Sequence, residues 1–193
     1  MSDQAWGADF DPDRLAFLGL RAWKAYYRRQ PVKLFGLLVM ANHEQAYVSW
    51  PRALLSALYL ARAASGFARA RGNYDRFAPD IARGYRMLGL PESVDAREVA
   101  RRELRWWVVR REIGLAAGDE AGKAITALYS ALYRRPEADV AQAGRLRGMA
   151  AEVRDRGAAA DPAGPAGAGA AYWPQVAALL RDSYRNLHAA LAA

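Results

Sequence analysis

The chain has 193 residues, 53% of them hydrophobic, which is enough for one domain with a sizeable core and excludes disorder by composition. It carries 28 lysines and arginines against 20 aspartates and glutamates, and this net charge of +8 admits nucleic acid or an anionic surface as partners. The absence of cysteine excludes disulfides, thiolate metal sites, iron–sulfur ligation and cysteine nucleophiles, and is consistent with a reducing compartment.

Neither a secretory signal nor a membrane span is expected. Residues 1–14 are acidic and lack the basic-then-apolar order of a signal peptide. The longest apolar run, residues 34–41, is far too short to cross a bilayer. We therefore expect a soluble, cytoplasmic protein.

Signals for the start and end of helices recur along the whole chain. Asp11 precedes a proline at the first position of the first predicted helix, Pro31 and Pro51 open the next two, and Pro79 is expected to break a fourth. No stretch alternates with period two for long enough to predict a strand. We predict an all-α protein, a compact bundle or array of seven or eight helices over residues 12–29, 32–47, 52–70, 74–90, 95–113, 119–135, 137–156 and 172–191.

Residues 157–171 are a low-complexity run of Gly, Ala and Pro, which predicts a flexible linker. The linker divides a helical domain, residues 1–156, from a C-terminal amphipathic helix within residues 172–193. Such a helix must bury its apolar face. We expect it to pack back on its own domain, with exchange between the two subunits of a homodimer as the alternative.

The helix predicted over residues 95–113 holds an anomaly. Its ends are marked by a capping-box pattern, Asp95 with Glu98, and by a glycine after the last residue. At 100° per residue, its tryptophans fall on one apolar arc, and Glu103 and Arg110 lie near the centre of that same arc. A charge placed there must find a partner or shift its pKa.

Two interpretations of this anomaly remain open. In the structural one, Glu103 forms a buried ion pair with an arginine of another helix, such as Arg62, which also falls on the apolar arc of its own helix. Glu103→Ala should then cost on the order of 3–5 kcal/mol. In the functional one, Glu103 is a general acid or base, or binds a cationic group, in a pocket lined by Arg110, Trp106, Trp107 and Arg62.

Recognisable catalytic and metal-binding motifs are missing. His43 and His188 are the only histidines, and neither has the spacing of a metal site. No phosphate-binding glycine loop, nucleophile elbow or acidic diphosphate motif occurs. We expect no metal and no cofactor, and the enzyme question stays open with Glu103 as the candidate.

Arginines and aromatic side chains are abundant. The first predicted helix carries the best contiguous basic face of the chain, formed by Arg14, Arg21, Lys24 and Arg28. Such a face could follow a phosphate backbone, but no known nucleic-acid-binding pattern accompanies it. Arginine and aromatic residues are also enriched at protein interfaces.

Three functional hypotheses follow. The first is a non-catalytic interaction or adaptor protein that binds a protein or peptide in an aromatic- and arginine-lined groove. The second is a small-molecule-binding protein or atypical enzyme that uses the pocket around Glu103. The third, which is not favoured, is nucleic-acid binding through the basic face of the first helix.

Overall fold

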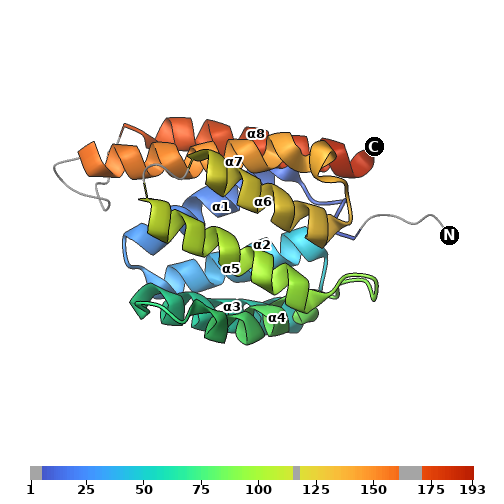
Figure 1. Ribbon diagram of the computed structural model, residues 1–193. Helices are drawn as coiled ribbons and strands as arrows, with labels where there is room; N and C mark the ends of the chain where they lie inside the picture. The colour runs from blue at the N-terminus through green and yellow to red at the C-terminus, as the bar shows by residue number, and fades with distance from the viewer. Residues whose placement is uncertain (1–5, 115–117, 161–170) are drawn as a thin grey trace.

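The computed structural model describes residues 6–114, 118–160 and 171–193, and the secondary structure in these ranges is entirely helical (Figure 1). The predicted all-α fold class is confirmed. The described helices are α1 (Pro12–Tyr27), α2 (Pro31–Ala46), α3 (Trp50–Arg69), the short 3-10 helix η1 (Tyr74–Phe77), α4 (Ala78–Met87), α5 (Ala96–Ile113), α6 (Gly118–Tyr133), α7 (Glu137–Ala160) and α8 (Trp173–Ala192).

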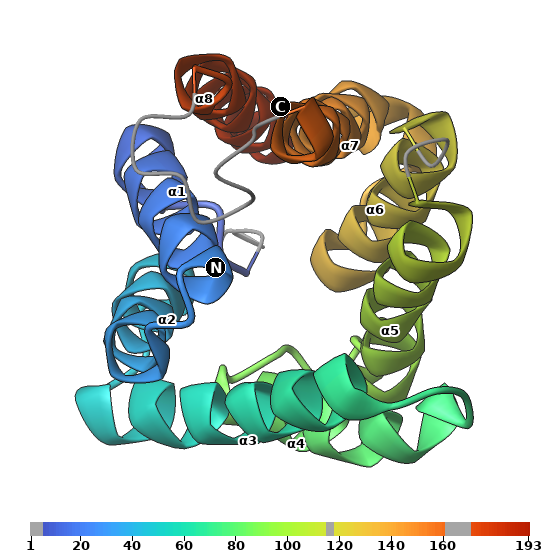
Figure 2. The same ribbon diagram turned by 90° about the vertical axis from the view of Figure 1, so that its left-hand side faces the viewer.

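The α-helices form a closed ring, in which each one packs mainly on its neighbours along the chain. The last helix, α8, packs on α7 and also on α1, which closes the ring. Figure 2 shows the ring end-on, with α1 and α2 on one side, α3 and α4 below, α5 and α6 on the other side, and α7 and α8 above. One large apolar cluster takes side chains from all eight α-helices, so the ring is held together by a common core.

Caps and prolines place the helix starts close to the predicted positions. The Asp11 carboxylate accepts hydrogen bonds from the backbone N–H groups of Asp13 and Arg14, at 2.9 and 3.1 Å. Asp95 caps α5 in the same way, 2.8 Å from the N–H of Arg97. Glu98 does not complete the predicted capping box, because it pairs instead with two arginines one turn further along, Arg101 and Arg102.

The helices α6 and α7 cross at a contact between two glycines. A Cβ atom added at Gly144 would lie 2.7 Å from the backbone nitrogen of Thr126 and 2.9 Å from the carbonyl oxygen of Gly122. One added at Gly122 would lie 3.1 Å from the Cα of Arg145. The two backbones therefore approach too closely for a side chain between them.

The C-terminal helix packs within its own chain. It contacts α7 and α1, and its apolar face is buried against them. The first four residues of the predicted linker, 157–160, are helical, because α7 continues through Gly157 to Ala160. The rest of the predicted linker, residues 161–170, lies outside the described residues. Of the helices described, none has both the length and the apolar character needed to cross a membrane.

Candidate functional site

Glu103 lies in α5 at a site of three hydrogen-bond donors. Its Oε1 accepts from the indole Nε1 of Trp106 at 3.1 Å and of Trp107 at 2.9 Å, because residues three and four positions apart share a face of a helix. Its Oε2 accepts from the hydroxyl of Tyr85 in α4, at 2.9 Å. Burial, and then the nearby charge of Glu103, raise the pKa of Tyr85 well above its usual value, so the phenol stays a donor.

The expected ion pair between Glu103 and Arg62 does not form. Arg62 is exposed and pairs with Asp80 of α4, with its Nε 2.7 Å from the carboxylate. Among the ion pairs of the described residues, none includes Glu103. All three of its contacts are neutral donors. The carboxylate is thus held by dipoles rather than by a cation.

The cation that Glu103 affects electrostatically is Arg147 of α7, which sequence analysis missed. Its Nη1 donates to the hydroxyls of Tyr129 in α6 and Tyr184 in α8, at 3.2 and 2.8 Å. Burial opposes the charge of Arg147, but the two tyrosines and Glu103 raise its pKa well above the usual value. The nearest signal in the sequence is a pair of arginines, Arg145 and Arg147, among the small and apolar residues of 143–151, and nothing there marks Arg147 as the buried one.

Arg110 belongs to a different network from Glu103, so the single pocket predicted around both does not form. Its guanidinium binds the carboxylate of Asp155 in α7 through two hydrogen bonds, of 3.0 and 2.8 Å. It also donates to the hydroxyl of Tyr27 in α1, at 2.5 Å. Trp106 and Trp107 donate hydrogen bonds to Glu103. Arg110 instead connects the C-terminal ends of α1, α5 and α7 through its bonds to Tyr27 and Asp155.

A second arginine that sequence analysis missed, Arg154, completes this network. Its guanidinium carbon lies 3.1 Å from the centre of the Tyr27 ring, and its Nη1 donates to Asp155 at 2.6 Å. On α1, one turn before Tyr27, the Nζ of Lys24 lies 5.3 Å from the ring of Trp173. We call this group the Tyr27 junction; its members are Lys24, Tyr27, Arg110, Arg154, Asp155 and Trp173.

The carboxylate of Asp155 gives the junction a dependence on pH. Burial alone would raise the pKa of Asp155, but the hydrogen bond and charge of Arg110, and then those of Arg154, lower it below the ordinary value. A lowered pKa in the folded state contributes stability that is complete above the unfolded pKa of about 3.9 and is lost as the pH falls through the folded value. The junction is therefore a source of acid sensitivity.

We predict that the destabilisation caused by Asp155→Asn shrinks as the pH falls below about 4, because wild-type Asp155 then becomes neutral as well. Urea denaturation at pH 7, 4 and 2.5, followed by circular dichroism, measures this difference. Asp139→Asn, at an exposed position of the same helix, removes one negative charge and leaves the junction intact. A difference between wild type and Asp155→Asn that stays constant over this range would contradict the assignment.

The predicted basic face of α1 is divided among separate contacts. Arg14 pairs with Glu44 of α2, and the guanidinium of Arg21 lies over the ring of Phe17. Lys24 turns toward Trp173, and partial burial, followed by the charge of Arg28, lowers the pKa of Lys24. Three of the four predicted side chains therefore make separate contacts instead of forming one basic stripe, and this weakens the nucleic-acid hypothesis.

The outer face of α3 is unexpectedly apolar. This helix buries four small residues, Ala53, Ser56, Ala57 and Ala63, together with Phe67, and exposes four large side chains of its N-terminal half. Trp50 is 54% exposed, Leu54 48% and Leu58 54%. Leu55 is exposed beside them. A helix packed for burial alone would do the reverse, since burying a leucine stabilises by roughly 1.5–3 kcal/mol.

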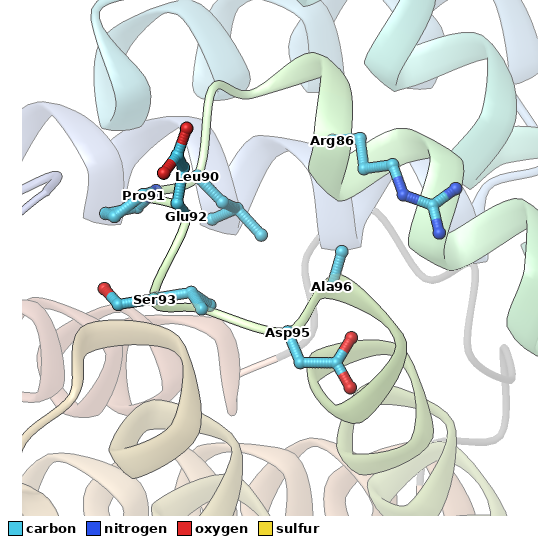
Figure 3. A pocket seen from close by; sticks show the side chains of 8 residues that line it. Arg86, Leu90, Pro91, Glu92, Ser93, Asp95 and Ala96 are labelled. Carbon is cyan, nitrogen blue, oxygen red and sulfur yellow. The ribbon is translucent and has the colours of Figure 1, made fainter.

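Two recesses on the surface of the described residues can be compared with the predicted groove, and neither matches it. One, of about 480 Å³, follows α4 and is lined by Arg86, Leu90, Pro91, Glu92, Ser93, Val94, Asp95 and Ala96. Figure 3 shows the charged side chains of Arg86, Glu92 and Asp95 spread apart rather than directed at one point. The second lies between α6 and α7. Neither includes an aromatic residue or any predicted site residue.

Within the described ranges, no group of three or more histidine, aspartate or glutamate side chains could hold a metal ion. His43 instead stacks on Trp50, with ring centres 4.0 Å apart, and His188 contacts Phe10.

The fold and these contacts define an all-α protein whose helices close into a ring around a common apolar core. Comparison of the chain with protein-family models, with curated proteins and with solved structures found no match. What the protein does is therefore inferred from its own residues.

Proposed function

We propose that the protein works by protein–protein contact, and that the outer face of α3 is its contact surface. The observation that carries this proposal is the exposure of Trp50, Leu54 and Leu58 on a helix that buries Ala53, Ala57 and Ala63. Contiguous exposed apolar patches on soluble proteins mark interaction sites. The proposed contact surface is an apolar helix face, whereas the sequence predicted an aromatic- and arginine-lined groove.

The face is nearly free of charge. Between Trp50 and Ala61 the only charged residue is Arg52, which turns aside to donate to the carbonyl oxygen of Met87, at 3.0 Å. At the other edge, Arg62 is neutralised by Asp80. An uncharged surface favours an apolar partner over an acidic one.

The pattern of large and small residues along the face fits a second copy of the chain. Its N-terminal half carries the large side chains Trp50, Leu54 and Leu58, and its C-terminal half carries small ones at matching spacing, Ala61, Ser65 and Ala68. If two α3 helices pair antiparallel about a twofold axis near residue 59, Leu58 lies opposite Ala61, Leu54 opposite Ser65, and Trp50 within a residue of Ala68. Each large side chain then meets a small one, and the same patch serves both copies.

The size of the face sets the expected affinity. Four large side chains at about half of full exposure offer on the order of 400 Å², less than the roughly 800 Å² per partner of a standard interface. We therefore expect a weak dimer. Since each copy carries +8, added salt should strengthen the association by screening their repulsion.

Leu58→Glu should abolish this association. A charge buried between two apolar helices loses its hydration without gaining a partner, so the dimer should dissociate at about 100-fold higher concentration than for the wild type. Sedimentation velocity between about 1 and 100 µM measures the shift. Phe17→Glu is the matched control, because Phe17 is equally exposed but lies on α1, and its dimer should be unchanged.

The register can be tested by cross-linking, since a cysteine introduced into this chain is unique. In the antiparallel arrangement the two copies of Ala61 are offset by about 4.5 Å along the helices, whereas those of Ala68 are offset by about 25 Å. Ala61→Cys should cross-link with a short thiol reagent and Ala68→Cys should not. The proposal would be overturned if the wild-type chain stayed monomeric at all concentrations. It would also be overturned if the Leu58→Glu and Phe17→Glu dimers dissociated at the same concentration.

A further inference from the structure

The Tyr27 junction has more positive charge than its carboxylate can balance. Arg110 and Arg154 share the single carboxylate of Asp155, and Lys24 contributes a third positive group beside Trp173. The other acidic residue on this part of α7, Glu152, is paired with Arg156. A buried cation without a matching anion destabilises the fold, so the surplus requires an explanation.

Two buried hydrogen-bond donors in the same region have no acceptor. They are the Nε of Arg154, whose side chain belongs to a residue only 8% exposed, and the indole Nε1 of Trp173, a residue 4% exposed. Buried donors in folded proteins nearly always have a partner, and an unpaired one signals an unseen water, ion or ligand. Both donors belong to residues packed around Tyr27: Arg154 lies on its ring, and Trp173 shares its apolar cluster.

The junction is partly exposed at the Arg110–Asp155 pair. The side chains of Arg110 and Asp155 are 18% and 19% exposed, whereas Arg154 and Trp173 are buried. A small group could therefore enter beside the Arg110–Asp155 pair. The residues packed beside the pair are aromatic: Tyr27, Trp173 and Trp23, whose ring lies 5.5 Å from the guanidinium carbon of Arg110.

We propose that the Tyr27 junction binds an oxyanion, a phosphate or a carboxylate carried by a small molecule, with Arg154 and Trp173 as the donors that recognise it. An oxyanion supplies the two things that the site lacks: a negative charge to balance the surplus guanidinium, and acceptors for the two unpaired N–H groups. A guanidinium offers several donors in one plane, which suits the oxygens of either group. The site is independent of the α3 face.

The test follows the indole N–H signals of the wild-type protein by nuclear magnetic resonance while inorganic phosphate or acetate is added at constant ionic strength. The Trp173 signal should shift and saturate as its N–H gains an acceptor. Three other indoles serve as internal controls, since Trp106 and Trp107 already donate to Glu103 and Trp6 to the carbonyl oxygen of Leu88. Phosphate and acetate titrations separate the two sources of the oxyanion.

Variants then test the residues by calorimetry. Trp173→Phe keeps a ring and removes only the N–H, and Arg154→Gln removes the guanidinium; each should weaken anion binding about tenfold or more. Arg97→Gln, an exposed change on α5, should bind like the wild type. If the Trp173 signal does not move with either anion, or moves no more than the three control indoles, the proposal is overturned.

Discussion

Glu103→Ala should lower the free energy of unfolding by about 3–5 kcal/mol, one of the largest effects expected for a single substitution in this chain. The reason differs from a broken ion pair. The substitution leaves two indole N–H groups and the buried hydroxyl of Tyr85 without their shared acceptor, and hydrogen bonds to a charged group contribute about 1.5–3 kcal/mol each. Urea denaturation followed by far-ultraviolet circular dichroism measures the change.

Three further variants separate the possible causes. Glu112→Ala removes an exposed carboxylate from the same helix and should change stability by less than about 0.5 kcal/mol. Glu103→Gln keeps an oxygen that can accept from both indoles and should cost less than alanine. Tyr85→Phe combined with Glu103→Ala should cost less than the two single changes added together, because both remove the same hydrogen bond. If Glu103→Ala were as stable as the wild type, the hydrogen bonds to Glu103 would contribute nothing to the stability of the fold.

The part of the Glu103 site within one helix could be predicted, and the part from other helices could not. A glutamate three and four positions before two tryptophans places all three on one helical face whatever the tertiary structure. Tyr85 reaches the same carboxylate from α4, and nothing in its local sequence marks it as the partner. Arg110 shows the same limit, since its partner Asp155 lies 45 positions away.

The wrong expectation for Arg62 has a specific physical cause. In α3 the leucines and the alanines form two apolar arcs, and sequence periodicity cannot tell which arc faces the core when both are apolar. Arg62 lies on the leucine arc, so an inward leucine arc would have buried it. The ring instead places the alanine arc inward, where small side chains let α3 approach its neighbours, and this leaves Arg62 at the surface with Asp80.

The fold class and helix positions, by contrast, were encoded locally. Asp11 and Asp95 cap helices through side-chain oxygens that any extended residue of that type can offer to the following N–H groups. The break expected near Pro79 falls at the change from η1 to α4. The closure of α8 onto α1 could not be predicted, because it depends on contacts such as the Asp13–Arg185 ion pair between opposite ends of the chain.

Gly144→Ala should destabilise the protein by about 3 kcal/mol, the second large effect that we expect. The new methyl group would overlap the side chain of Thr126 and lie 2.7 Å from its backbone nitrogen, so α7 must move away from α6. Side chains can rotate out of such a clash, whereas a helix backbone cannot. The gain of up to about 1 kcal/mol from the higher helix propensity of alanine is too small to compensate. Thermal and urea denaturation measure the loss.

Gly36→Ala isolates the propensity effect from the clash. Gly36 also lies within a helix, but an added methyl group there meets no atom within 4 Å, so this variant should gain roughly 0.5–1 kcal/mol. The same substitution is thus expected to change stability in opposite directions at two helical glycines. If both variants were stabilised, the backbones of α6 and α7 could not cross as closely as described, and the ring would have to close by a different packing of α7 between α6 and α8.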